Sequence, residues 1–250
     1  MRESFKENGK DTYDPEDFPF RRARELVRQR RSAVAMDGMT HMDQAEFFKV
    51  LCQLMPEYNP RLFNLASELN RVQLGLFIHR VEGLTPGLYL LVRNKDKLSE
   101  LQKVMDQSFL WRPIDDCPLE LDLYCLQEAD LRELARRLSC DQPIASQGVF
   151  SCAMLAEFEA PIHHEGAWYY RKLFWECGLI GQQLYLEAEL RGLQGTGIGC
   201  FFDDPVHQVF GLEGFGYQSL YHFTLGRGLD DPRLQTYPAY YFLDSTEAGD

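Results

Sequence analysis

Two segments at opposite ends of the chain carry side chains suited to holding a phosphate. Arg30, Arg31 and Ser32 follow one another at the end of a basic stretch, and Arg227 stands between two glycines late in the chain. Guanidinium groups and a hydroxyl donate well to phosphate oxygens and to carbonyl edges. Taken singly, a basic helix end or a loop arginine is more typical of a solvated surface. Because these donors occur together in one chain, we predict that they form a binding site.

A cluster of four glycines lies between these donors and the last apolar stretch, in the run GLQGTGIG over residues 192–199. The run does not match G-x-G-x-x-G, and it follows a predicted helix rather than a strand, so it is not a dinucleotide-binding motif. It also lacks the Gly-Lys-Ser/Thr of a P-loop. We predict a glycine-rich loop whose backbone approaches a flat or anionic group. A turn that ends a helix is the plainer interpretation.

Two other parts of the chain carry reactive side chains. His163, His164 and Glu165 are metal-binding types, but adjacent residues rarely converge on one ion and no partner at zinc spacing is present, so no metal site is predicted. Cys200 and His207 suggest a thiol nucleophile, although no third group to orient the histidine can be identified. A buried cysteine and a surface histidine are the simpler prediction for this pair.

Composition narrows the class of protein. The chain has 250 residues, 45% hydrophobic and 26% charged, with a formal net charge of -12. An acidic chain is a poor general binder of nucleic acid or of anionic membranes. There is no apolar run of about 18 residues, and the polar, acidic start does not fit a signal peptide. The 7 cysteines show no C-x-x-C pair, so neither a disulfide framework nor a thiolate zinc site is indicated, and a reducing cytoplasm is expected.

Apolar periodicity predicts the elements that must position these groups. Strands are expected at 72–78, 88–92, 119–125, 149–158 and 217–225, and helices at 20–32, 43–56, 97–109, 131–138 and 168–191, with a short helix ending at 210. Asp43 is expected to cap the second helix, with Glu46 completing a capping box. The long helix carries two apolar stripes, which predicts burial on most sides. Strands and helices alternate without a strict βαβ rhythm, so we expect an α+β layered domain.

Three segments together resemble the nitroreductase-like FMN flavoproteins. They are RQRRSAVAMDG (28–38), HRVEGLTPGLYLL (79–91) and the long block from YYRKLFWECGLIGQQ to FFDDPVHQVFGLEG (169–214). The branch they resemble most is the azoline dehydrogenases of thiazole and oxazole peptide maturation. The resemblance implies a three-layer α/β/α sandwich of the α+β class, with a mainly antiparallel central sheet flanked by helices.

The resemblance also implies a site and a partner. FMN would lie in the groove of a homodimer, and the flavin would carry the redox step between a small-molecule substrate and a donor such as NAD(P)H. Its phosphate, ribityl chain and pyrimidine edge would be held by Arg30, Arg31, Ser32 and Arg227. Its ring would lie along Thr196, Gly197, Ile198 and Gly199. The domain would span residues 19–228, between a loose arm (1–18) and a C-terminal extension (229–250).

The chain departs from the family pattern at two places. Val34 stands where a basic residue is usual, two positions after Ser32. The stretch 56–71 does not match the Ser/Asn-rich segment that touches the flavin, and Asn59, Asn64 and Asn70 are loose candidates for it. These departures motivate an alternative hypothesis, a flavin-free binding or assembly module or one half of a tandem pseudo-dimer. A cysteine hydrolase around Cys200 is a third, weaker hypothesis.

Overall fold

The computed structural model describes residues 18–63 and 70–244, which fall into two compact units. The larger unit is Arg31–Asp231, and the smaller one joins the chain up to Arg30 with the chain from Pro232 onward. The smaller unit contains α1 (Phe18–Gln29) and α10 (Tyr241–Asp244). Within it the Arg28 guanidinium lies 5.8 Å from the centre of the Tyr240 ring. Almost all of the expected N-terminal arm lies outside the described residues.

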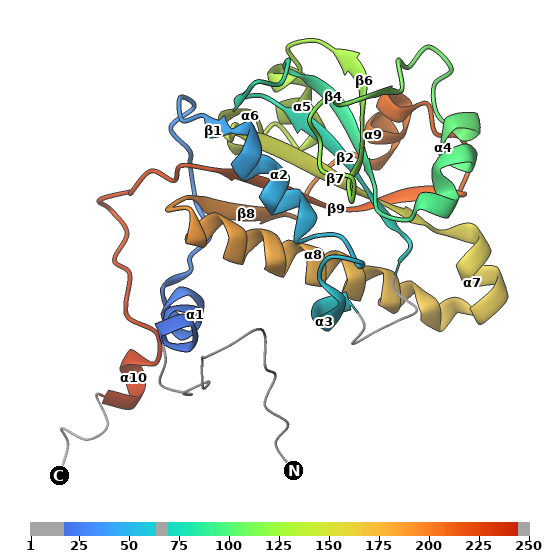
Figure 1. The fold of residues 1–250 in the computed structure, drawn as a ribbon. Coiled ribbons are helices and arrows are strands. Elements are labelled where there is room, and N and C mark those ends of the chain that lie inside the picture. Colours follow the sequence, from blue (N-terminus) through green and yellow to red (C-terminus); the bar gives the residue numbers. More distant parts are fainter. Residues whose placement is uncertain (1–17, 64–69, 245–250) are drawn as a thin grey trace, which may run out of the picture. The chain divides into compact units, whose positions relative to one another are not determined.

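A seven-stranded sheet runs through the larger unit (Figure 1). Its strands lie in the order β5 (Arg112–Pro113), β6 (Asp122–Glu128), β4 (Gly87–Val92), β2 (Val72–Ile78), β7 (Phe150–Glu157), β9 (Tyr217–Gly226) and β8 (Gln194–Ile198). Every neighbouring pair is antiparallel. A separate two-stranded parallel pair joins β1 (Met42–Asp43) to β3 (Val81–Glu82).

Helices cover both faces of the sheet, which gives the predicted three layers. One face packs against α2 (Gln44–Cys52), α3 (Pro60–Phe63) and α8 (Tyr170–Leu190). The other packs against α4 (Leu98–Val104), α5 (Arg132–Leu138) and α9 (Asp203–Phe210). Short helices α6 (Ile144–Gln147) and α7 (Glu159–Glu165) flank β7 in sequence. The α+β sandwich with an antiparallel sheet is therefore confirmed.

The two cores follow from the alternation of side chains along each strand. In β7, Cys152 and Met154 belong to the core under α2 and α8, whereas Ala153 and Leu155 belong to the core under α4, α5 and α9. All of β2, β4 and β7 is buried, as expected for strands covered on both faces. In the middle of β2 the lack of a side chain at Gly75 leaves room for the Phe210 ring of α9.

Strands 72–78, 88–92, 149–158 and 217–225 are confirmed to within two residues of their predicted ends. The strand expected at 119–125 begins at Asp122, because Leu121 N–H closes a turn onto the Pro118 carbonyl. The helix expected at 97–109 ends at Val104, where Met105 turns extended.

The N-terminus of α2 forms as predicted, except for one half of the capping box. Asp43 accepts hydrogen bonds from Ala45 N and Glu46 N, at 2.8 and 3.4 Å. The Glu46 carboxylate accepts from Lys49 and Arg191 and so ties α2 to the end of α8.

The long helix α8 is not buried on most sides, contrary to the prediction. Ile180 and Leu184 are fully buried against the sheet. On the other stripe Leu179 is half-buried and Leu190 is 40% exposed. The helix thus covers one face of the sheet and leaves a broad apolar surface uncovered. Among the described residues, no helix is long and apolar enough to cross a membrane.

Candidate functional site

The glycine-rich run forms an edge strand and not the predicted loop. Gln194–Ile198 is β8, which pairs with β9 over its whole length, from Gln194 opposite Gly226 to Ile198 opposite His222. Gly192, with a φ of 66°, ends α8 just before it. The prediction failed because two glycines in the five positions of the strand hide the apolar alternation by which strands are recognised.

Glycine is required in β8 because aromatic rings of β9 lie over it. A Cβ at Gly195 would run into the Phe223 ring, and a Cβ at Gly197 would run into the Tyr221 hydroxyl. Nothing lies within 4 Å of a Cβ placed at Gly199, which is exposed. Rings of β9 therefore fill the space where side chains would stand at Gly195 and Gly197, and the space at Gly199 is open.

The basic segment docks on the outer edge of this strand. Ser32 bridges to Gly195, and Ala33 N–H donates to the Gly195 carbonyl at 3.1 Å. The Thr196 hydroxyl donates to the Ala33 carbonyl at 2.6 Å. Arg31 N–H donates to the Glu189 carboxylate of α8, at 3.3 Å. The structure thus brings Arg31 and Ser32 beside the predicted glycine segment, although 162 positions separate Ser32 from Gln194 in the sequence.

Tyr185 of α8 joins the basic segment to β8. The sequence analysis did not predict this residue as part of the site. Its hydroxyl lies 2.8 Å from Ser32 Oγ and accepts from Gly197 N–H at 2.9 Å. Its ring packs edge-on against Phe223, with the ring centres 4.8 Å apart. One signal was available, since Tyr185 is a polar-tipped aromatic among aliphatic residues of the long helix.

Arg227 reaches the same corner of the sheet from the end of β9. Its carbonyl accepts from Asp37 N–H at 3.0 Å, and the next residue, Gly228, bridges to Met36. A Cβ at Gly228 would lie 3.5 Å from Ala33 Cβ, so the chain after β9 runs directly beside the basic segment. The Arg227 side chain is exposed.

The Arg227 charge acts on a carboxylate at this corner, that of Asp37. Burial acts to raise the pKa of Asp37, but hydrogen bonds from Thr40 and Met39 and the Arg227 charge outweigh it and lower that pKa. The Asp37 carboxylate is thereby held by its own loop. Arg30 belongs to the smaller unit, so its predicted role is untested and stays a prediction.

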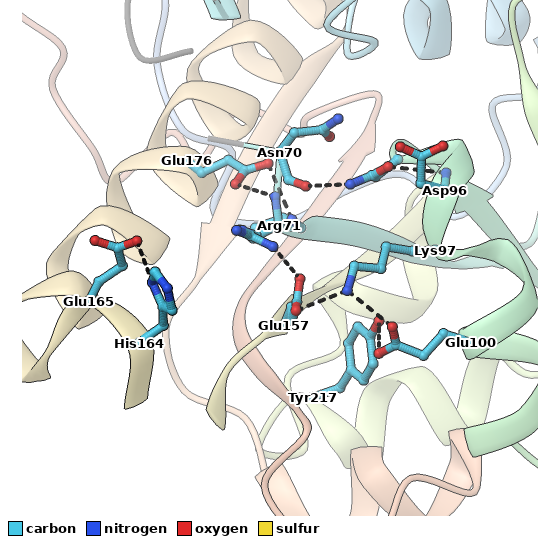
Figure 2. Close-up of polar contacts among 12 residues, drawn as sticks. Asn70, Arg71, Asp96, Lys97, Glu100, Glu157, His164, Glu165, Glu176 and Tyr217 are labelled. Carbon is cyan, nitrogen blue, oxygen red and sulfur yellow. Dashed lines mark hydrogen bonds and ion pairs between the residues drawn. The ribbon is translucent and has the colours of Figure 1, made fainter. Parts of the chain in front are cut away.

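The structure describes Val34 and two of the three candidate asparagines, which mark the departures from the family pattern. Val34 is 61% exposed. Asn59 donates to the Gln53 carbonyl, and Asn64 lies outside the described residues. Asn70 lies beside Glu176, as Figure 2 shows, and Glu176 precedes Tyr185 by nine residues, or about 14 Å of helix. The two described asparagines therefore do not join the basic segment.

Cys200 and His207 do not form a catalytic pair, and the predicted burial is reversed. Cys200 is exposed and forms a disulfide with Cys140, with Cα atoms 5.9 Å apart. His207 is buried, and its Nε2 accepts from Ser219 N–H at 3.1 Å. The cysteine spacing did not indicate this pair, because the turn after α5 meets the end of β8 only in the folded chain.

The His163-His164-Glu165 group lies on the surface of α7. His164 Nδ1 is 2.9 Å from the carboxylate of its neighbour Glu165, and Figure 2 shows this pair apart from the other polar contacts drawn. Across residues 18–63 and 70–244, no three His, Cys, Asp or Glu side chains gather as metal ligands.

Solved structures share this fold. A candidate nitroreductase from Anabaena variabilis aligns over 84% of this chain with a TM-score of 0.64 and 22% identity, and this chain spans 39% of that protein. A chain of the E. coli microcin synthetase McbBCD complex aligns over 92% of this chain and 79% of its own length, with a TM-score of 0.59 and 16% identity. A protein from Ralstonia eutropha aligns over 84% of both chains, with a TM-score of 0.53 and 11% identity. No curated protein matches.

An antiparallel seven-stranded sheet between two helical layers, with basic donors and a glycine strand at one corner, defines a protein of the nitroreductase fold. The family model described as "Nitroreductase family" matches residues 40–227, about three quarters of the chain. The chain therefore belongs to the Nitroreductase family. Members of this family typically bind FMN, so the general class is a flavin-type oxidoreductase.

Proposed function

We propose that this protein is an FMN-dependent oxidoreductase that works as a homodimer in the cytoplasm. The observation that carries the proposal is the corner where β8, the Arg31–Ser32 segment and Arg227 meet. Two arginines and a hydroxyl from distant parts of the chain lie there beside the glycine strand. Such a corner suits a ligand with a phosphate at one end and a flat, polar-edged ring at the other.

We propose that the residues of the corner bind different parts of FMN. Arg31 and Arg227 would bind the phosphate, because guanidinium groups match its oxygens in pairs. Ser32 would bind the ribityl chain, and Arg30 is proposed to add a further donor. The outer edge of β8, with Gly197 and Gly199, would lie along the ring. Bound FMN would accept a hydride from reduced nicotinamide or a substrate C–H bond and pass it to an acceptor.

An azoline-type small molecule is the substrate class we favour. The support is the fold shared with a chain of the E. coli microcin synthetase complex, which contains a truncated pro-peptide of microcin B17. The motifs at 28–38, 79–91 and 169–214 point in the same direction. A nitro or quinone compound is the alternative substrate within the same proposal.

The uncovered face of α8 supports a homodimer. A groove of about 210 Å³ runs along it, lined by Phe174, Gly178, Gly181 and Tyr185 among others. Trp175, 56% exposed, stands on the same helix. Because Tyr185 belongs both to the groove and to the basic corner, a second copy seated on this face would also cover the flavin site. Burial of such a face is the usual driving force for a symmetric dimer.

Titration with FMN tests the proposal. We expect purified protein to quench FMN fluorescence stoichiometrically and to melt at a higher temperature when FMN is present. Replacing Arg227 by Gln should weaken FMN binding about tenfold, the effect of losing a charge-assisted hydrogen bond. Colourless protein whose melting temperature ignores FMN would remove the proposal.

One observation favours a second candidate, a flavin-free binding or assembly module. The Tyr185 hydroxyl already takes two polar groups of the site, Ser32 Oγ and Gly197 N–H. Val34 also adds no charge to the corner. If FMN fails to bind while the protein still dimerises or assembles with a tandem partner, this second candidate stands in place of the enzyme.

A further inference from the structure

A cavity lies at the end of the sheet where β2 and β7 meet the turns around α5 and α6, away from β8. Its volume is about 440 Å³, and its walls include Gly38, Met39, His79, Arg80, Asp130 and Arg132. A second hollow of about 380 Å³ shares Arg80, Asp130 and Arg132 with it and extends to Ser146 and Gln147. The family resemblance and the proposed flavin site give this cavity no role.

Arg80 forms the inner wall, and only 9% of its surface is exposed. Its Nη1 donates to the carbonyls of Ser146 and Gly148, at 3.1 and 2.7 Å. Its Nη2 points toward Gly38, since a Cβ at Gly38 would lie 3.9 Å from that atom. The guanidinium is therefore anchored by one nitrogen and offers another to the cavity.

A second buried arginine, Arg93, has the carboxylate partner that Arg80 lacks among the described residues. Arg93 is also buried, 1% exposed, and its guanidinium is paired with the buried carboxylate of Glu176. Within the described residues Arg80 has no carboxylate at ion-pair distance. Because a buried charge is costly unless it is paired, an unpaired buried arginine at a cavity wall indicates an anion supplied from outside.

The carboxylates near Arg80 do not take the place of that anion. Asp130 accepts two hydrogen bonds from Arg132, at 2.9 and 2.6 Å, and is thus already used. Asp37 is held by Met39 and Thr40 of its own loop. The pKa of Arg80 is lowered, first by burial and then by repulsion from Arg132, although Asp37 and Asp130 act against this. Two guanidiniums thus face one cavity: Arg132 is paired with Asp130, which lines the same cavity, whereas Arg80 has no carboxylate at ion-pair distance among the described residues.

His79 adds a second polar atom without a partner. It is 6% exposed, and its Nε2 donates to the Ala145 carbonyl at 3.0 Å. Burial lowers its pKa to about 4, so the ring is neutral and Nδ1 carries a lone pair. That Nδ1 is buried without a hydrogen-bond partner. A neutral His79 thus adds no positive charge to the wall, and its buried Nδ1 is out of reach of a ligand in the cavity.

We propose that the cavity walled by His79, Arg80 and Arg132 binds an oxyanion, either a phosphate or a carboxylate group of a small molecule. Arg80 Nη2 binds an anionic oxygen, and the exposed side of the Arg132 guanidinium closes over it. None of the residues proposed to hold FMN lines this cavity, and the site does not depend on FMN being bound. The segment 31–41 nevertheless runs from one to the other, since Ser32 bridges to Gly195 and Gly38 faces Arg80.

Calorimetric titration of the full chain with inorganic phosphate, and separately with acetate, tests the site. We expect saturable binding of at least one of them, and which one identifies the chemical source. Arg80→Gln should weaken it about tenfold or more. Because Arg227 is itself proposed to bind phosphate, each anion is also titrated against Arg227→Gln, in which binding at this cavity should remain. Lys103→Gln, which removes an equal charge on α4, should leave binding at this cavity unchanged.

Met39 provides a variant that spares the hydrogen bonds of Arg80. It is 74% exposed on the rim of the cavity. Met39→Glu should weaken oxyanion binding, and Met39→Lys should strengthen it, with no change in melting temperature. The proposal is overturned if neither anion binds, if Arg227→Gln alone abolishes binding, or if both Met39 variants bind as the native chain does. Loss of FMN binding with phosphate binding intact would count against the flavin proposal alone.

Discussion

At the scale of single residues, Tyr185 decides how the basic segment and the glycine strand meet. Its hydroxyl is within hydrogen-bond distance of both Ser32 Oγ and Gly197 N–H. Neither contact follows from sequence spacing, because Ser32 lies 153 positions from Tyr185. The identities of Arg31, Ser32 and Arg227 were accessible from residue type and family pattern. Tyr185, which joins Ser32 to Gly197, was harder to identify, since a tyrosine in an apolar helix stripe is usually core.

Tyr185→Phe removes this hydroxyl and keeps the ring against Phe223. We expect FMN affinity to fall about fivefold, because losing one hydrogen bond costs about 1 kcal/mol and lets the two segments move apart. Fluorescence titration measures the affinity, and thermal unfolding without FMN separates it from a loss of stability. Tighter FMN binding would show that the hydroxyl competes with the flavin rather than preparing its site.

His222 gives a pH dependence of stability with a definite sign. Burial lowers its folded-state pKa to about 3, from 6.5 in the unfolded chain. The ring stacks on Phe201, with centres 4.3 Å apart, and its Nε2 lies 3.1 Å from Ser219 Oγ. As the pH falls below 6.5, the unfolded chain gains a proton that the folded one refuses, so stability present at neutral pH is lost.

We therefore expect the free energy of unfolding to fall between pH ~6.5 and ~5 by up to ~1.4 kcal/mol per pH unit for each such histidine. His79, whose pKa is lowered to about 4, adds to the slope. Carboxylates such as Glu133, with a pKa lowered to about 2, contribute only at more acidic pH. Denaturant unfolding at several pH values should give a shallower slope for His222→Gln. An unchanged slope would contradict the assignment.

At the scale of elements, β8 is the strand that could not be predicted from the sequence. Strands 72–78 and 149–158 were predictable, because their apolar residues are continuous and local. In β8 the determinants lie on another strand, in the Tyr221 and Phe223 rings that exclude side chains at Gly197 and Gly195. The Arg80 cavity was hidden for the same reason, since its walls come from segments that only the fold assembles.

Gly197→Ala tests the fit between β8 and β9. The added methyl would meet the Tyr221 hydroxyl, and we expect the free energy of unfolding to drop by about 1–3 kcal/mol, as for other overpacked sites. Gly199→Ala is the matched control, because a Cβ there meets nothing within 4 Å. It should change stability by less than about 0.5 kcal/mol. Equal stabilities in denaturant unfolding would refute the packing argument.

At the scale of the whole molecule, the fold class and its layers were predictable, but the burial of α8 was overestimated. The second stripe of α8 was expected to be buried within the chain, whereas Leu179 is half-buried and Leu190 is exposed. Apolar periodicity reports that a face is covered and does not report whether the cover is the same chain or another copy. The homodimer that we propose would resolve this difference.

Trp175→Glu tests that surface. Placing a charge on the exposed apolar face of α8 should shift the protein from dimer to monomer in sedimentation experiments and weaken FMN binding in parallel. Leu119→Glu is the control, because Leu119 is 95% exposed on the loop before β6. If both variants keep the native sedimentation coefficient, α8 is not the dimer interface.

The strand order also constrains when the flavin corner can form during synthesis. β8 joins the sheet only through β9, and β9 is the last of the seven strands in the sequence. A nascent chain that has emerged through β8 therefore has the basic segment, the glycine strand and five strands of the sheet, but lacks β9, the strand on which β8 pairs. Such non-local closure is slow compared with helix formation. We expect FMN added during translation to be captured only after β9 has left the ribosome.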